Sequence, residues 1–184
     1  MEGAQLAMAD EIRHTRSCLE MAARYGAGNV EPGPLELGVV GGRVSLEDAV
    51  RSAVREGCVG ETMAALLASR AAEAATDPHA RATLAVIAED ETRHAALAWR
   101  FVAWAIEQGG DTARTAVLDA LALARADVQH GLAAEAIPNH ELDAEVSPHG
   151  RLPARARAAI AREALDRVVL PCIQALFASS RPIS

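Results

Sequence analysis

The same five-residue pattern occurs twice in this chain. Residues 10–14 read DEIRH and residues 90–94 read DETRH, so each copy is an Asp followed by Glu-x-x-His. Residues three apart on a helix share a face, and each helical copy would therefore point a carboxylate and an imidazole in one direction. Two such pairs on facing helices offer four metal ligands. The pattern predicts paired helices with a metal centre between them.

The composition favours a single all-α domain. Of the 184 residues 51% are apolar and only 3% are aromatic, and such a mixture suits close-packed helices better than a β-sandwich. The net charge is −7 and no basic patch occurs, so nucleic acid is not an expected partner.

The compartment is inferred from what the sequence does not contain. No apolar run approaches the ~18 residues of a membrane span, and no signal-peptide pattern begins the chain. The three cysteines lack CxxC spacing, which is typical of reduced thiols. We expect a cytoplasmic protein without a membrane association.

Apolar periodicity and helix-end signals predict the helices. Gly26 and Gly28 end the first helix, Asp77 caps the third ahead of Pro78, and Gly109-Gly110 separates the third from the fourth. Pro171 is expected to kink or end the last helix. The predicted helices cover residues 4–25, 46–75, 78–108, 111–134 and 154–178.

Two long connections remain, a Gly- and Pro-rich one at 26–45 and a polar one at 135–153. The helices beside the first are up to roughly 40 Å long, and an extended connection of this length reaches roughly 60 Å. It can therefore return along the whole bundle, which predicts a helical bundle with a long crossover.

Five residues on the apolar stripes of the predicted helices are candidate metal ligands. A buried charge must be paired or bind a metal ion. Glu61 lies among small residues such as Gly57 and Ala65, which we expect to leave space for an ion and a small ligand. Carboxylates and imidazoles together suit Fe(II), Mn(II) or Zn(II). The candidate ligands are Glu11, His14, Glu61, Glu91 and His94.

The acid that begins each copy has a second expected role. A ligating His usually donates its other N–H to a carboxylate, so Asp10 is predicted to hold His94 and Asp90 to hold His14. The alternative is that both acids are exposed partners of the arginines inside the two copies. Cys58 and Cys18 are close in sequence to Glu61 and His14 but are interpreted as small core hydrophobes.

These motifs resemble the ferritin-like di-iron carboxylate superfamily, and more narrowly a group of bacterial ferritin-like-domain proteins. The stretches that carry the resemblance are DEIRHTRSCLEMAARYG, EGCVGETMAAL and DETRHAALAWRFVAWAIEQGG. The resemblance implies that residues 11–14 and 91–94 are the second- and fourth-helix ligand pairs, that Glu61 is the bridging third-helix Glu, and that 26–45 is the family's crossover.

The family's first helix, with its own Glu, has no counterpart, so the expected bundle is N-terminally shortened and its site has five ligands instead of six. The sixth could come from upstream sequence, from a second subunit, or from an acid such as Glu135, Glu141 or Glu163; alternatively the site is depleted. A missing helix exposes an apolar groove, which favours either a homodimer or repacking of the last helix into the gap; a homodimer is the expectation.

The leading hypothesis is a non-haem di-iron oxidoreductase that uses O₂ or peroxide to oxidise a small substrate. Two Fe ions are expected, with Mn or Zn as possible substitutes. The alternatives are a helical module that binds metal, or none, without turnover, and a zinc hydrolase with three ligands and a bound water.

Overall fold

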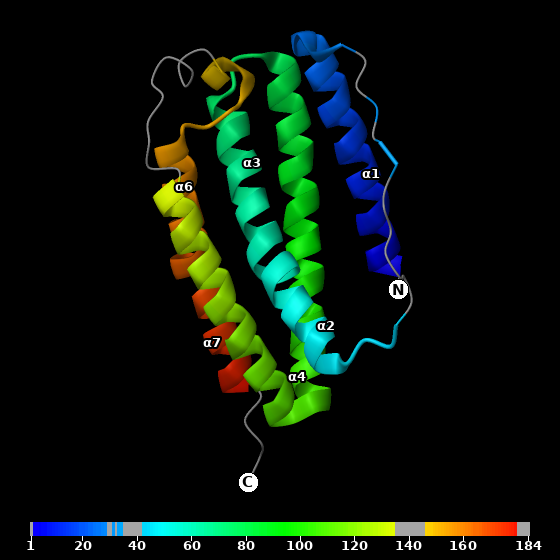
Figure 1. The fold of residues 1–184 in the computed structure, drawn as a ribbon, viewed down its shortest axis with the longest axis vertical. Helices are drawn as coiled ribbons and strands as arrows, with labels where there is room; N and C mark the ends of the chain where they lie inside the picture. The colour runs from blue at the N-terminus through cyan, green and yellow to red at the C-terminus, as the bar shows by residue number, and fades with distance from the viewer. Residues whose placement is uncertain (1, 29–30, 32, 35–41, 135–145, 180–184) are drawn as a thin grey trace. The chain divides into compact units, whose positions relative to one another are not determined.

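The computed structural model describes residues 2–28, 31, 33–34, 42–134 and 146–179. Over these ranges the protein is all-α and contains no strand, as the composition predicts (Figure 1). The chain forms two compact units, residues 1–45 and residues 46–184. The single-domain prediction stays a prediction, and we describe each unit by itself. No helix of the described residues is long and apolar enough to cross a membrane.

The N-terminal unit contains one long helix, α1 (Glu2–Ala22), which continues into the short π-helix η1 (Ala23–Ala27). The predicted glycine stop is confirmed, since Gly26 and Gly28 have φ angles of +93° and +70°. These positive φ angles suit glycine and end the helix. Half of the predicted crossover at 26–45 falls outside the described residues, so the crossover stays a prediction.

The faces of α1 differ from the predicted stripe. Its buried residues are Asp10 and His14, both polar, whereas Glu11 and Cys18 are exposed. The buried positions of this copy are thus its Asp and its His, whereas Glu11, which was predicted on the apolar stripe, is exposed.

The C-terminal unit is built from helices that follow one another with short or no breaks. The predicted second helix begins as α2, passes through a π-helical segment and continues as α3. The predicted last helix likewise contains a π-helical turn. The elements are α2 (Leu46–Ser52), η2 (Ala53–Glu61), α3 (Thr62–Ala74), α4 (Pro78–Ala134), the 3₁₀ turn η3 (Ser147–His149), α6 (Ala154–Ala164), η4 (Leu165–Val169) and α7 (Leu170–Ser179).

Helix α4 has two arms that meet at Gly110, whose φ and ψ of 52° and −132° are not helical. The predicted break between the third and fourth helices is confirmed at this residue. Figure 1 shows the second arm turning back at this point and running in the opposite direction to the first. Pro171 does not end the last helix; it is the second residue of α7, and the π-helical turn η4 ends two residues before it. A π turn accommodates the backbone N–H that proline lacks.

The core of the C-terminal unit lies between α2–η2, the two arms of α4 and η4–α7. Its fully buried side chains are small or β-branched: Val50, Val54, Cys58, Val102, Ala105, Ala116, Val117, Ala120 and Val169. Small side chains let the helices approach closely. A Cβ added to Gly57 would lie 2.4 Å from the Cβ of Ala98, so the helices are in contact there. The expected space beside Gly57 is therefore filled by packing.

The turn between α3 and α4 is held by a segment far away in sequence. Asp77 caps α4 as predicted, accepting a hydrogen bond from the His79 N–H at 2.8 Å. The N–H groups of Thr76 and Asp77 donate to the Pro148 carbonyl at 2.9 and 3.1 Å. His149, which falls in the polar connection predicted at 135–153, belongs to η3 and lies 3.6 Å from the Asp77 carboxylate. The end of the α3–α4 hairpin is therefore fixed.

Candidate metal centre

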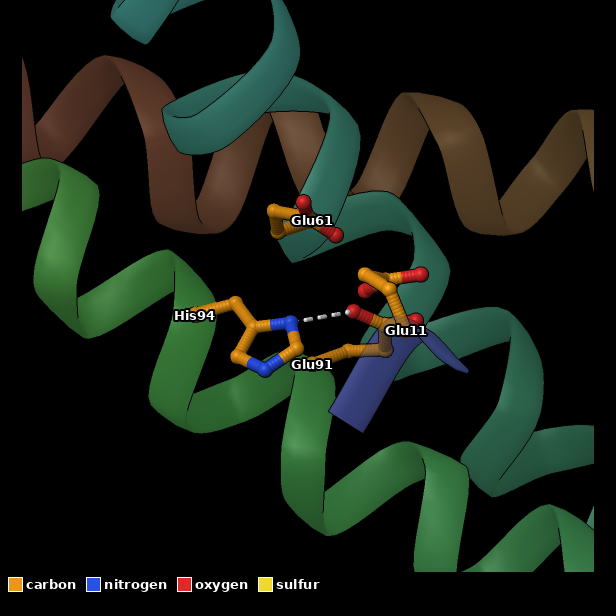
Figure 2. A group of neighbouring side chains, drawn as sticks. All are labelled: Glu11, Glu61, Glu91 and His94. Carbon is orange, nitrogen blue, oxygen red and sulfur yellow. Dashed lines mark hydrogen bonds and ion pairs between the residues drawn. The ribbon is translucent and has the colours of Figure 1, made fainter. Parts of the chain in front are cut away.

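Three predicted ligands of the C-terminal unit meet between η2 and α4. One oxygen of Glu61, one oxygen of Glu91 and one imidazole nitrogen of His94 all lie within 4.8 Å of one another. Figure 2 shows these side chains pointing toward one another; it also labels Glu11, which belongs to the N-terminal unit. Two carboxylates and one imidazole form the donor set of an Fe, Mn or Zn site.

The π-helical segment η2 determines the direction of Glu61, which is its last residue. A π-helix makes i→i+5 hydrogen bonds, so the side chains that follow it are rotated relative to an α-helix. It also disturbs the regular pairing of carbonyl groups, and the buried Thr62 hydroxyl donates to the Cys58 carbonyl at 2.6 Å. Sequence reasoning missed Thr62. The only signal was a hydroxyl four residues after an apolar residue, which is common in helices.

Glu91 and His94 lie one turn apart in α4 and both are buried. The His94 Nδ1 is 3.1 Å from the Glu91 Oε2, and the helix therefore presents the two groups as a preformed pair. Burial makes an uncompensated charge here costly, which is the condition under which acids and histidines bind metals.

Electrostatics favours a cation between the two carboxylates. Unit negative charges no more than 4.8 Å apart repel by ~3 kcal/mol at an effective dielectric constant of about 20. A divalent ion between them replaces this repulsion by attraction to both groups. The residues of the C-terminal unit therefore fit a metal ion by charge, donor type and spacing.

The copy in α1 has a similar internal geometry. The His14 Nδ1 lies 3.8 Å from the Glu11 Oε1, compared with 3.1 Å in the α4 copy. The structure thus arranges Glu11 and His14 as a candidate ligand pair within the N-terminal unit. That they complete the centre in the other unit is a proposal, which we develop below.

Each leading Asp forms an ion pair with the Arg of its own copy, Asp10 with Arg13 and Asp90 with Arg93. This was the alternative considered from sequence, except that both acids are buried instead of exposed. The predicted bonds from these acids to the histidines of the opposite copy would join the two units, and they stay a prediction.

The two cysteines interpreted as core residues, Cys58 and Cys18, differ in their burial. Cys58 is fully buried in the core, as predicted, and burial together with the neighbouring Cys172 thiol raises its pKa to about 12. A thiol of this kind stays protonated and is a poor metal ligand. Cys18 is exposed, contrary to the core interpretation, although partial burial still raises its pKa.

Of the three acids considered as a sixth ligand, the structure describes only Glu163. Glu163 lies 3.7 Å from Arg167 on its own helix, and it does not belong to the group of potential ligands found among the described residues. Glu135 and Glu141 lie outside the described part of the chain. The source of a sixth carboxylate stays open.

A groove of about 440 Å³ lies between α3 and α4. Its lining includes Ala65, which follows Glu61 by one turn, and Ala88, which precedes Glu91 by one turn. The hydroxyl-bearing Ser69 also lines it. Ala65, which was expected to border space for a small ligand, therefore lines a groove, whereas Gly57 does not; the lining contains none of the three candidate ligands of this unit.

Comparison with known proteins found no matching family model, no similar curated protein and no similar solved structure. The fold and the cluster define the protein as an all-α helical protein with a buried Glu/His carboxylate group that can hold a metal ion. Any narrower assignment belongs to the proposals that follow.

Proposed function

We propose that this protein is a ferritin-like, non-haem di-metal oxidoreductase that uses O₂ or peroxide to oxidise a small substrate. The observation that carries the proposal is the convergence of Glu61, Glu91 and His94 in one metal-capable group. The repeated motif adds Glu11 and His14, which gives five ligands for two ions. Iron is the metal we favour, because this donor set with O₂ chemistry is typical of iron.

Bound metal ions would supply the redox chemistry, in which the substrate loses electrons and O₂ or peroxide accepts them. The protein supplies positions and charge. Glu61, the last residue of η2, would hold the ions together with Glu91 and His94, and Glu11 and His14 would add a further carboxylate and imidazole. Burial of Glu91 and His94 limits the access of bulk water to the ions.

The alanine-lined groove between α3 and α4 is the candidate substrate site. It begins one helical turn from Glu61 and Glu91, and its lining is mostly apolar with a few hydroxyl and carboxylate groups. A small, largely apolar molecule would fit there beside the ions. Substitution of Ala88 by Leu would fill the groove and should raise the KM for such a substrate with little effect on metal content.

Anaerobic reconstitution with Fe(II) tests the proposal. We expect close to two irons per chain and an absorption change when O₂ is admitted. Glu91→Ala should lose iron, whereas Glu89→Ala, an exposed acid two residues earlier in α4, should not. Wild-type protein that takes up no iron would refute the proposal.

A metal-binding module without turnover is the second candidate, favoured by the count of five ligands and by the pairing of Glu163 with Arg167. Metal without O₂ reactivity would support it. A single zinc and indifference to O₂ would instead indicate a zinc hydrolase.

We also propose a homodimer, whose second copy could supply the sixth carboxylate. Sedimentation with and without metal tests whether the protein is a dimer and whether metal favours the dimer.

A further inference from the structure

The helix that carries Glu11 and His14 has little apolar burial to hold it in place. The buried residues of α1 are Asp10 and His14, and none of its apolar side chains is buried. Leu6, Met8 and Ile12 are 60%, 68% and 54% exposed. A lone helix of this length is marginal in water, because most helical stability in proteins comes from packing an apolar face. Apolar packing is therefore not what fixes α1.

The C-terminal unit does not have this problem. Every residue of the hydrophobic core cluster belongs to residues 46–184. Its copy of the motif is part of α4, whose two arms line that core. Glu91 and His94 are consequently held by a folded unit, whereas Glu11 and His14 depend on where α1 is placed.

We propose that metal binding docks α1 onto the C-terminal unit, so that the centre is half-formed without metal and complete with it. The inference rests on the proposed function and concerns the regulation of that site. Glu61, Glu91 and His94 would capture the first ion, and its remaining coordination positions and charge would recruit the carboxylate and imidazole of α1. Part of the metal-binding free energy then offsets the cost of ordering α1, as in other sites whose ligands come together only with the metal.

If the proposal is right, metal binding must favour docking of α1, and docking of α1 must favour metal binding. A metal that binds the docked form more tightly than the undocked form stabilises docking, by at most the ratio of its two affinities. Loss of a ligand in α4 must therefore release α1, although the substitution lies in the other unit. By the same linkage, docking of α1 strengthens metal binding at the cluster in α4, so loss of a ligand in α1 must weaken that binding.

Hydrogen exchange on the full-length protein, followed by mass spectrometry, tests the proposal. Amide exchange of α1 is compared in apo protein and with Mn(II), which avoids oxidation. With Mn(II) at 100 times its dissociation constant, exchange in α1 should slow by up to about 100-fold. Exchange in the second arm of α4 should change little, and this arm reports whether each variant is folded.

Two isosteric variants separate coupling from general stabilisation. Glu91→Gln should abolish the protection of α1 by Mn(II). Glu89→Gln, an exposed neighbour on the same helix, should leave it intact. Titration calorimetry measures Mn(II) binding in parallel.

The outcomes distinguish this inference from the proposed function. Mn(II) binding without a change in α1 exchange overturns the inference and leaves the metal site standing, as does an α1 already fully protected in the apo protein. No Mn(II) or Fe(II) binding by the wild type overturns both. Protection of α1 that depends on Glu91 and not on Glu89 supports both.

Discussion

The two Asp-Glu-x-Arg-His copies have the same internal contacts and different surroundings. In each, the Asp pairs with the Arg and the His lies within 4 Å of the Glu. The copy at 90–94 is embedded in α4, where Asp90, Glu91 and His94 are all buried. The copy at 10–14 leaves Glu11 exposed. The sequence pattern sets the local pairing, and only the surroundings bring one copy together with Glu61 in a metal-capable group.

The largest difference between the copies is expected in metal affinity. Glu91→Gln removes a ligand that is already in place beside Glu61 and should weaken Mn(II) binding by about 100-fold or more, beyond the 10–100-fold typical of outer-shell changes. Glu11→Gln should weaken it less, because docking α1 already costs part of the binding energy. Calorimetry on both variants checks this. Equal losses would show that both copies are equally preformed.

The close packing behind the α4 copy predicts the next largest effect. Gly57→Ala places a methyl group 2.4 Å from the Ala98 Cβ and should lower the free energy of unfolding by about 1–3 kcal/mol. Ala98→Gly in the same chain should recover most of this loss. Gly131→Ala is the control: nothing lies within 4 Å of its added Cβ, so it should be neutral or stabilise slightly. Denaturant unfolding measures all three, and a harmless Gly57→Ala would contradict the observed contact.

The two cysteines Cys58 and Cys18 should differ in their effect on stability in alkaline solution. The Cys58 pKa of about 12 lies above the ordinary value of 9.0, because burial disfavours the thiolate. The unfolded chain therefore releases this proton first, and the stability from Cys58 is complete below pH 9 and lost as the pH rises toward 12, by about 1.4 kcal/mol per unit. Unfolding measured from pH 8 to 11 should show this slope.

Cysteine variants show which thiol causes the pH dependence of the free energy of unfolding. Cys58→Ala should remove most of it, whatever it does to stability at pH 8. Cys18→Ala should leave most of it, because Cys18 is exposed and its pKa is raised by partial burial alone. An unchanged slope in Cys58→Ala would mean that another group titrates in this range.

The smallest effects are expected at the paired arginines. Arg13 and Arg93 are 55% and 59% exposed, and pairs that reach solvent typically contribute about 0.2–1 kcal/mol. Arg93→Gln should nevertheless lower the free energy of unfolding more than Arg13→Gln. Asp90 belongs to the unit that holds the core, so the loss of its Arg93 partner affects global unfolding. Thermal unfolding of the two variants, with Arg100→Gln as an exposed control, checks the order.

Local signals determined much of the fold. Gly26, Asp77 and Gly110 stop, cap or break helices where the sequence predicts, because backbone conformation and capping depend on a few adjacent residues. The spacing of Glu91 and His94 likewise fixes their pairing on one face of α4. The sequence also identified Glu61 as the third member of the group, from its place among small residues.

Tertiary structure decided what local periodicity cannot encode. The π-helical turn that directs Glu61 depends on how η2 packs against α4. A hydrophobic pattern with 3.6 residues per turn does not reveal such a turn. The contact of Gly57 with Ala98 and the return of Pro148 to the α3–α4 turn join residues distant in sequence. The sequence by itself thus determined which side chains could bind a metal. Packing between helices decided that Glu61, Glu91 and His94 meet, because that meeting depends on the phase and separation of two helices and not on either alone.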